Sequence, residues 1–170
     1  MSKAFLKDDA QDEQIAVPAR PPLPPGTPNY VTPRGLRLLE AERAELSAER
    51  ARLEAGAGGD LERARGLAAL REREAELEAR LKSAEVVRTA PPGVVGFGAT
   101  VTVRTLSGRF AGEERRLTIV GVDEAAADED RVAFTAPVAR ALAGHKVGER
   151  AQMETARGRQ TLEVVAVGEP

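Results

Sequence analysis

The residues with the clearest chemical potential lie near the middle of the chain. Asp60 and Glu62 follow the glycines Gly58 and Gly59, and Arg63 comes directly after Glu62. Carboxylate oxygens are the ligands that Mg²⁺ prefers, so two acids this close together could contact a metal ion and its bound water. The guanidinium of Arg63 works against this role, because a nearby cation weakens the binding of another cation.

Other residue types that carry chemistry are scarce. The chain of 170 residues has no cysteine, which excludes disulfides and thiolate sites for metals or redox chemistry. His145 is the only histidine, and no second metal ligand lies near it in the turn from Gly144 to Gly148, so we expect no metal or general-base role. With 25 basic and 27 acidic residues the net charge is −2, which argues against binding to free DNA. No apolar run could span a membrane and no signal peptide is recognisable, so we expect a cytoplasmic protein without a membrane partner.

The two acids must be positioned by the segments on either side of them. Thr32 is a good N-cap and Pro33 suits the first helical position. The first arm then repeats leucine every seven residues, at Leu39, Leu46 and Leu53. The second arm continues the apolar spacing of three, four and seven at Leu67, Leu70, Leu77, Leu81 and Ala84. Such spacing is typical of a coiled-coil seam.

Glycines separate the arms and give the pair of helices its turn. The segment 55–59 breaks the helix, and Asp60 can cap the second arm. Arg34 and Val86 lie equally far from Asp60, so residues 31–87 are predicted to form a symmetric antiparallel coiled-coil hairpin with its tip near residues 55–60. Glu74 falls on the seam, where its side chain would have to reach outward or leave the packing loose.

The rest of the chain has a different character on each side of the hairpin. Residues 1–30 are mixed in charge and then rich in proline, which predicts a disordered leader. Residues 88–95 contain Pro91, Pro92 and Gly93 and read as a linker. Residues 96–170 change to a period of two, with strands predicted over 99–104, 117–122, 131–134 and 162–167, a weaker one over 151–155, and a short helix over 137–142. The fold class is therefore α+β, with a small antiparallel sheet and one short helix.

Several of these segments resemble one known family. The stretches that carry the likeness are residues 1–5, 24–35, 97–103, 119–124, 137–142 and 147–149. In order and spacing they resemble the GreA/GreB transcription elongation factors, with a start like that of the GreB type. The resemblance implies a coiled-coil hairpin joined to an FKBP-like domain. It also implies that the domain docks on RNA polymerase and that the hairpin reaches through the secondary channel toward the active site.

The resemblance gives the acids and one loop expected roles. In the family the acids of the tip help to hold a magnesium ion and water, so that the polymerase cleaves its own backtracked transcript. The loop before the short helix contacts the polymerase rim and usually reads Asp or Asn followed by Ser-Pro. Here that loop is Thr135-Ala136-Pro137, which makes these residues the candidates for docking. Ala136 is a poor N-cap in place of serine.

This chain departs from the family at the tip and along the arms. Asp60 matches, but Arg63 occupies the position of the second acid and Ala64 that of the following Asn. Glu62 lies one place early, a rotation of about 100° on a helix. Each arm also lacks about one heptad, which keeps the seam in register but would withdraw the tip by about 10 Å.

These observations lead to a polymerase-binding protein with a degraded tip. We expect it to modulate elongation or rescue of backtracked complexes from the secondary channel, with weak or no stimulation of cleavage and no active site of its own. We expect it to be a monomer and to meet transcript RNA only inside the polymerase. We also expect it to hold no stable cofactor; at most, Asp60 would transiently contact an Mg²⁺ ion that is shared with the polymerase. The alternatives are a full transcript-cleavage factor, a coiled-coil adaptor that has left the polymerase, and a prolyl isomerase.

Overall fold

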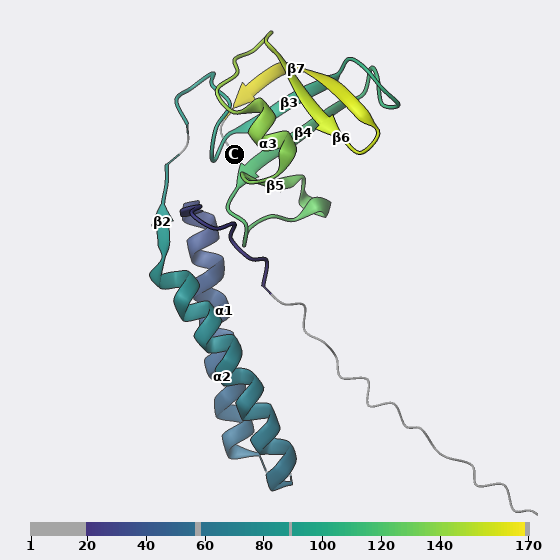
Figure 1. Ribbon diagram of the computed structural model, residues 1–170. Helices are drawn as coiled ribbons and strands as arrows, with labels where there is room; N and C mark the ends of the chain where they lie inside the picture. The colour runs from purple at the N-terminus through teal and green to yellow at the C-terminus, as the bar shows by residue number, and fades with distance from the viewer. Residues whose placement is uncertain (1–19, 57–58, 89, 169–170) are drawn as a thin grey trace, which may run out of the picture.

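The computed structural model describes residues 20–56, 59–88 and 90–168. Two long helices form a hairpin, and a five-stranded sheet with one short helix forms a separate domain at the base of that hairpin (Figure 1). The predicted mixture of helix and sheet is therefore confirmed. Residues 1–19, most of the predicted leader, lie outside the described residues.

The hairpin consists of α1 (Pro33–Ala55) and α2 (Asp60–Lys82). Thr32 is the N-cap of α1 as predicted, since its hydroxyl oxygen accepts a hydrogen bond from the backbone N–H of Gly35 at 2.9 Å. Pro33 follows at the first helical position, where its missing N–H leaves no hydrogen bond unmade. The helix ends at Gly56, which is already extended (φ −73°, ψ 150°).

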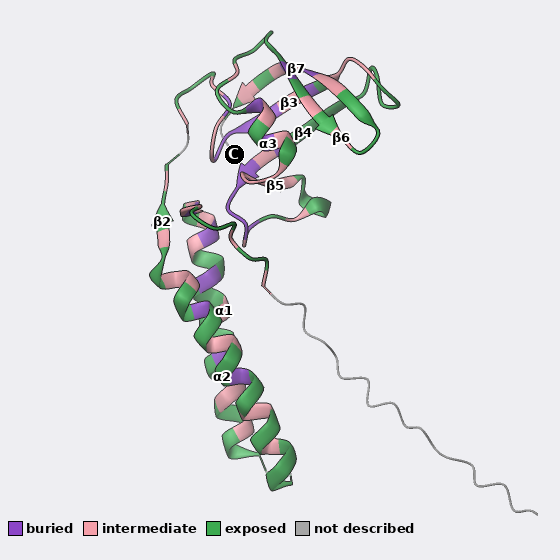
Figure 2. Cartoon of the chain, viewed as in Figure 1, coloured by how far each residue is buried: buried purple, intermediate pink, exposed green. Residues whose placement is uncertain are grey.

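Leucines hold the two helices together along most of the predicted seam. The fully buried members are Leu39, Leu46, Leu70 and Leu77. Partly buried side chains extend the seam at both ends, namely Leu36, Leu53, Leu81 and Ala84. Figure 2 shows these buried positions as a stripe on otherwise exposed helices. Because exposed residues dominate both helices, the stability of the hairpin depends on this narrow apolar contact.

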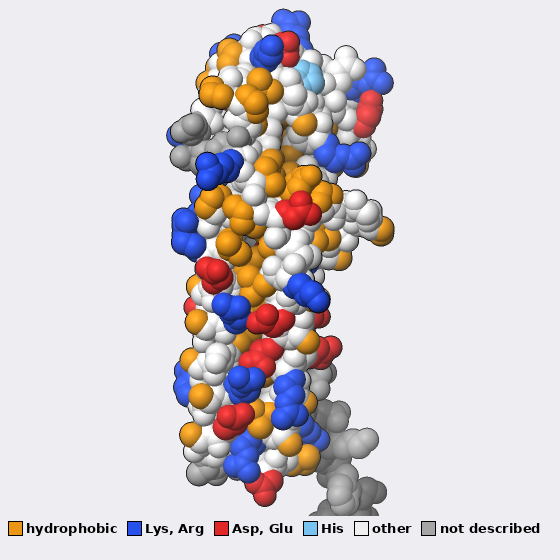
Figure 3. Space-filling model, turned by 90° about the vertical axis from the view of Figure 1, so that its left-hand side faces the viewer, with side chains coloured by type: hydrophobic (Ala, Val, Ile, Leu, Met, Phe, Trp, Pro, Cys, Tyr) orange, Lys and Arg blue, Asp and Glu red, His pale blue; other side chains and the backbone are white. Residues whose placement is uncertain are grey.

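Ion pairs join the two helices across the seam. They join Arg43 to Glu78 at 3.9 Å, Arg50 to Glu74 at 3.0 Å and Arg73 to Glu49 at 3.6 Å. Glu74 therefore turns outward from the seam and is neutralised by Arg50. Figure 3 shows acidic and basic side chains interleaved along the hairpin, an arrangement typical of a solvated helical surface.

A pair of short strands closes the base of the hairpin. β1 (Asn29–Val31) runs parallel to β2 (Ala84–Val86), and Val31 joins the apolar cluster of the helices. The buried amide of Asn29 donates to the carbonyl oxygen of Arg80 at 2.8 Å. The prediction of a disordered leader is therefore wrong for this last part of it, because backbone pairing and a buried side chain fix it to the helices.

The sheet of the domain has the strand order β5-β4-β3-β7-β6. Its strands are β3 (Thr100–Thr105), β4 (Glu114–Val120), β5 (Arg131–Ala133), β6 (Arg150–Thr155) and β7 (Gly158–Gly168). The helical elements are the 3₁₀ turn η1 (Ala127–Glu129) and α3 (Pro137–Leu142). All five predicted strands and the short helix are present, with shifted strand ends.

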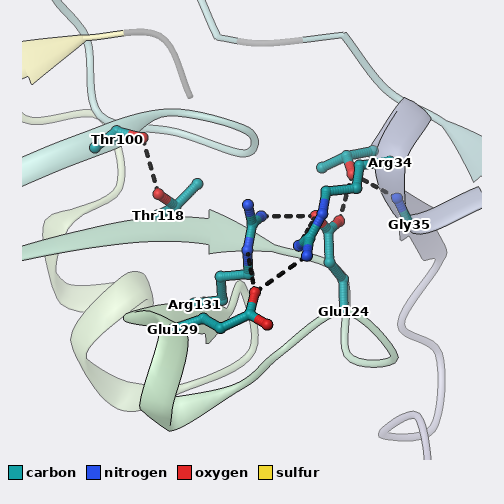
Figure 4. Close-up of polar contacts among 8 residues, drawn as sticks. Arg34, Gly35, Thr100, Thr118, Glu124, Glu129 and Arg131 are labelled. Atoms are coloured by element: carbon teal, nitrogen blue, oxygen red, sulfur yellow. Dashed lines mark hydrogen bonds and ion pairs between the residues drawn. The ribbon is translucent and has the colours of Figure 1, made fainter. Parts of the chain in front are cut away.

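One pairing in this sheet differs from the prediction of an antiparallel sheet. β5 runs parallel to β4, with Thr118 opposite Arg131, whereas the other three pairings are antiparallel. The reason is the connection from Gly121 to Asp130, which includes η1 and carries the chain back to Thr118, so that β5 pairs with the last three residues of β4 in the same direction. This crossover also places the acidic residues of the connection beside the base of the hairpin (Figure 4).

The core of the domain lies between one face of the sheet and α3. Its buried members are Val95, Val101, Val103, Leu117, Ile119, Ala139, Leu142, Ala151, Leu162 and Val164. Alternate residues of β3, β4 and β7 supply most of them, as expected for strands with one covered face. Among the described residues, no helix combines the length and apolar character needed to cross a membrane.

Candidate functional site

The tip of the hairpin carries the candidate acids, and its geometry differs from the predicted cap. Gly59 is the N-cap of α2 and Asp60 is its first residue, without a side-chain capping hydrogen bond. The prediction that Asp60 caps the second helix is therefore wrong. Its carboxylate instead pairs with the guanidinium of Arg63, one turn along the helix, with Oδ1 and Nη2 2.5 Å apart. The side chain of Asp60 is 94% exposed.

Arg63 also contacts the end of the other helix. Its Nη1 donates to the carbonyl oxygen of Gly56 at 3.2 Å, a carbonyl left free where α1 ends. One guanidinium thus joins both sides of the turn and neutralises the acid that matches the family. The remaining exposed side chains of this first turn of α2 are Leu61, which is 67% exposed, and Glu62.

The tip by itself does not fit a magnesium site. Residues 20–56, 59–88 and 90–168 contain no cluster of three or more His, Cys, Asp or Glu that could hold a metal ion. Asp60 and Glu62 are both exposed, and the charge of Asp60 is compensated by Arg63. A metal ion held here would need further ligands from another molecule.

The candidate docking loop lies in the domain, between β5 and α3. Ala136 is the N-cap of α3 and makes no side-chain capping hydrogen bond, as predicted for alanine at this position. Its backbone N–H donates to the carbonyl oxygen of Ala133 at 2.9 Å, which closes the turn. Pro137 at the start of α3 is exposed, whereas Thr135 and Ala136 are half-buried. The structure therefore separates the docking candidates from the tip, at opposite ends of the molecule (Figure 1).

The single histidine occupies a structural position. The ring Nδ1 of His145 lies 3.2 Å from the carbonyl oxygen of Leu142, at the end of α3. Its own carbonyl oxygen accepts from the N–H of Val95 at 2.8 Å. These contacts connect the turn after α3 to the start of the domain.

A third group of polar residues lies where the hairpin meets the domain, and sequence reasoning assigned it no role. Asp123 belongs to the connection after β4 and is almost buried. Its Oδ1 lies 2.7 Å from Nη1 of Arg20, and its Oδ2 lies 3.3 Å from Nε of Arg80 on α2. Arg20 also pairs with Glu42 on α1 at 2.6 Å. The carboxylate of Asp123 thus receives one cation from the leader and one from the second helix.

The next residue, Glu124, makes the corresponding contacts with the first helix (Figure 4). It accepts a hydrogen bond from the hydroxyl of Thr32, and its Oε1 lies 3.4 Å from Arg34 and 2.8 Å from Arg131. Glu129 lies 3.1 Å from the same two arginines and completes the network. We call Asp123 and Glu124 the junction carboxylates.

The charge of Arg20 is stabilised by this network. Burial by itself disfavours a charged guanidinium. The hydrogen bonds and ion pairs with Glu42 and Asp123 outweigh burial and raise the pKa of Arg20 above its usual value. The leader is therefore attached to both the hairpin and the domain by a permanently charged side chain.

Aromatic side chains pack beside the junction carboxylates. The rings of Tyr30, Phe97 and Phe134 lie 5.6–5.9 Å apart, centre to centre. Gly121 allows this approach, because a Cβ at that position would lie 2.5 Å from the carbonyl oxygen of Tyr30. These rings contact one another across the junction, so they give no support to the aromatic pocket that prolyl isomerisation would need.

Two stretches of the sequence that carry the family resemblance form this junction, although nothing in the sequence showed that they would meet. Residues 24–35 and 119–124 are among the stretches that carry the family resemblance. In the structure they supply Tyr30, Thr32 and Arg34 on one side and the junction carboxylates on the other. Two segments that resemble one family therefore meet at one contact.

Comparisons with known proteins agree with the resemblance to the GreA/GreB family. The family described as "Transcription elongation factor, GreA/GreB, C-term" matches residues 90–169. Transcription elongation factor GreA of Desulfovibrio desulfuricans is 34% identical over 151 residues, which cover 81% of this chain and 91% of that protein. GreA of Francisella tularensis subsp. novicida is 35% identical over 153 residues, covering 81% and 94%.

A solved structure matches with lower similarity. GreA factor homolog 1 (Gfh1) of Thermus thermophilus has 24% identity and a TM-score of 0.38, over 84% of this chain and 99% of that chain. On the identity and coverage of its curated relatives, the chain belongs to the GreA/GreB family of transcription elongation factors.

Proposed function

We propose that this protein binds bacterial RNA polymerase at the secondary channel and modulates elongation there with little stimulation of transcript cleavage. In this proposal the sheet domain, FKBP-like in type, docks through the loop Thr135–Pro137. The two-helix hairpin, as a short coiled coil, enters the channel. Family membership supports the partner, and the separation of loop and tip supports the division of roles.

The observation that carries the proposal is the pairing of Asp60 with Arg63. A second catalytic Mg²⁺ needs oxygen ligands with free negative charge. At the tip the matching acid already faces a guanidinium at 2.5 Å, and Glu62 lies one position away from the place of the second acid. What reaches the channel is therefore an exposed leucine, a compensated acid and Glu62 at a displaced position, a set that can occupy space without holding the metal firmly.

The protein has no catalytic centre of its own in this proposal. Any cleavage would be performed by the polymerase, with a magnesium ion that Asp60 contacts only transiently and shares with the polymerase. Transcript RNA would be met only inside the polymerase. We propose that the protein acts in the cytoplasm as a monomer and does not bind free DNA.

A transcript-cleavage assay on backtracked elongation complexes tests the proposal. We expect the unchanged protein to slow or alter elongation with cleavage close to the level of polymerase alone. Arg63→Glu should raise cleavage at least about tenfold if the tip arrives near the active site, because it restores an acid and frees Asp60. Arg65→Glu changes the same charge on an exposed neighbouring position and should have no such effect.

Two results would contradict the proposed function. One is strong cleavage by the unchanged protein that Asp60→Asn abolishes, which would identify a full cleavage factor. The other is the absence of any binding to polymerase, which would favour an adaptor that has left the polymerase.

A further inference from the structure

The junction carboxylates are buried charges that the proposed function does not yet use. The side chains of Asp123 and Glu124 are 7% and 2% exposed. Charges are buried in proteins only where they are paired and hydrogen-bonded, because their desolvation costs several kcal/mol. Removing one partner therefore leaves a buried charge without compensation, so the contacts cannot be exchanged freely for water.

The groups that pair with them come from the leader, from both helices of the hairpin and from the domain. Asp123 receives Arg20 from the leader and Arg80 from α2. Glu124 receives Thr32 and Arg34 from the start of α1, while Arg131 holds it from the domain side. Asp123 thus contacts the second helix and Glu124 the first, so two neighbouring residues of one connection hold both helices; Figure 4 shows the contacts of Glu124.

The covalent route between the two parts is one stretch of chain between β2 and β3. After β2 the chain passes to the domain through a stretch that contains Pro91, Pro92 and Gly93. The aromatic contacts of Tyr30 with Phe97 and Phe134 add apolar area and prefer tilted or edge-to-face packing. Hydrogen bonds and close ion pairs also depend on direction, and those of the junction carboxylates reach both helices, so they can select one orientation of the hairpin.

The hairpin amplifies any change at this point. Each helix has 23 residues. At about 1.5 Å per residue a helix of this length spans about 34 Å, so a tilt of about 10° at its base moves the far end by about 6 Å. Positioning within a reaction site tolerates errors of only about 1 Å. The angle at the junction therefore decides whether the tip reaches a given place.

We propose that Asp123 and Glu124 are positioning residues that fix the direction of the hairpin relative to the domain and thereby the place where its tip arrives. Their effect on transcription rests on the proposed function, whereas their effect on the direction of the hairpin does not. Gly35 gives an independent way to test the geometry. A Cβ on Gly35 would lie 2.9 Å from Oε2 of Glu124, so Gly35→Ala displaces the contact without removing a charge.

The direction of the hairpin can be measured with spin labels, because the chain has no cysteine of its own. Arg65→Cys near the tip and Gln152→Cys on β6 place labels at exposed positions of the two parts. We expect one narrow distance distribution in the unchanged protein. Asp123→Asn, Glu124→Gln and Gly35→Ala should each shift its maximum by about 6 Å or roughly double its width, as a tilt of about 10° would.

Two controls separate direction from stability. Glu114→Gln removes an exposed ion pair with Arg104 on the same sheet and should leave the distribution unchanged. Gly66→Ala makes the same change in the other helix, where the nearest atom is the flexible end of Leu53. This control should also leave the distance distribution unchanged. If Asp123→Asn or Glu124→Gln fails to fold, Gly35→Ala decides. A folded Gly35→Ala protein with the unchanged distribution would overturn the proposal.

The consequence for transcription needs a second measurement. The variants that shift the distribution should still compete with the unchanged protein for polymerase, because the docking loop is untouched. Their effect on elongation should fall about tenfold or more, as expected for a misplaced tip. If the unchanged protein does not bind polymerase, the proposed function fails while the distance measurements still decide the role of the junction carboxylates.

Discussion

At the scale of single residues, Arg63 changes what the tip offers to a partner. An exposed ion pair of this kind contributes little to stability. Its effect is chemical, since the guanidinium takes the carboxylate that would otherwise be free for a metal ion. The same residue donates to the carbonyl oxygen of Gly56 and so keeps the turn closed. Relative to the pattern that the family resemblance implies, Arg63 would thus alter both the charge and the hydrogen bonding of the tip.

Gly121 shows how strictly one residue can limit the junction. Gly121→Ala places a Cβ 2.5 Å from the backbone oxygen of Tyr30, a distance that requires the backbone to move. We expect this change to destabilise the contact between hairpin and domain by about 1–3 kcal/mol, the range typical of overpacked sites. Thermal denaturation followed by circular dichroism measures it.

Gly168 provides the matched control, since nothing lies within 4 Å of a Cβ there. Gly168→Ala should therefore leave the melting temperature nearly unchanged. Equal melting temperatures for the two variants would show that Gly121 does not limit the approach of Tyr30.

At the scale of elements, the length of the hairpin limits its reach. Leucine contacts and ion pairs keep α1 and α2 in register, so both arms must change length together. The alignment with the family predicts one heptad fewer in each arm. This prediction can be tested by restoring the missing length.

A matched insertion should bring a repaired tip closer to its target. Duplicating residues 44–50 in α1 and 71–77 in α2 adds one heptad to each arm and preserves the seam. Combined with Arg63→Glu, we expect it to raise transcript cleavage by about tenfold or more over Arg63→Glu alone, because reach and charge are both corrected. The readout is the rate of cleavage in backtracked complexes.

An unmatched insertion controls for added residues. Duplicating residues 44–50 alone displaces one helix relative to the other and should give no gain. No difference between the matched insertion and Arg63→Glu alone would show that arm length does not limit the activity.

At the scale of the whole molecule, the proposed function assigns docking to the domain and entry into the channel to the tip of the hairpin. The docking candidates lie beside α3 in the domain, the tip lies at the far end of the hairpin, and the junction carboxylates lie between them. A defect at each place should therefore have a different measurable effect. A change in the docking loop should weaken binding to polymerase, a change at the tip should alter cleavage, and a change at the junction carboxylates should misplace the tip.

Retention of RNA polymerase by the tagged protein tests the docking end. We expect polymerase to be retained, and Pro137→Glu to weaken binding by about tenfold or more, because it puts a charge on the exposed start of α3 in the docking loop. Gln152→Glu adds the same charge at an exposed position of β6, on the opposite face of the strand from Ala151, which packs in the core with α3, and should bind normally. Equal binding by both variants would place the docking surface elsewhere.

The sequence by itself determined the elements and their apolar faces. The heptad leucines indicated both helices, Thr32 and Pro33 marked the start of α1, and the period of two indicated the strands. These features depend on residues close together in the chain, so local pattern is sufficient to predict them. The departure of the tip from the family pattern was equally visible, since Arg63 can be read directly.

The tertiary structure alone decided what is joined to what. Asp60 does not cap α2, β5 is parallel to β4, and the end of the leader is a strand. Asp123 and Glu124 looked like ordinary acids after a strand, yet they are the buried partners of Arg20, Arg34 and Arg80. The energy of each such contact comes from residues far apart in the chain that share one low-dielectric place, and no local pattern contains that information.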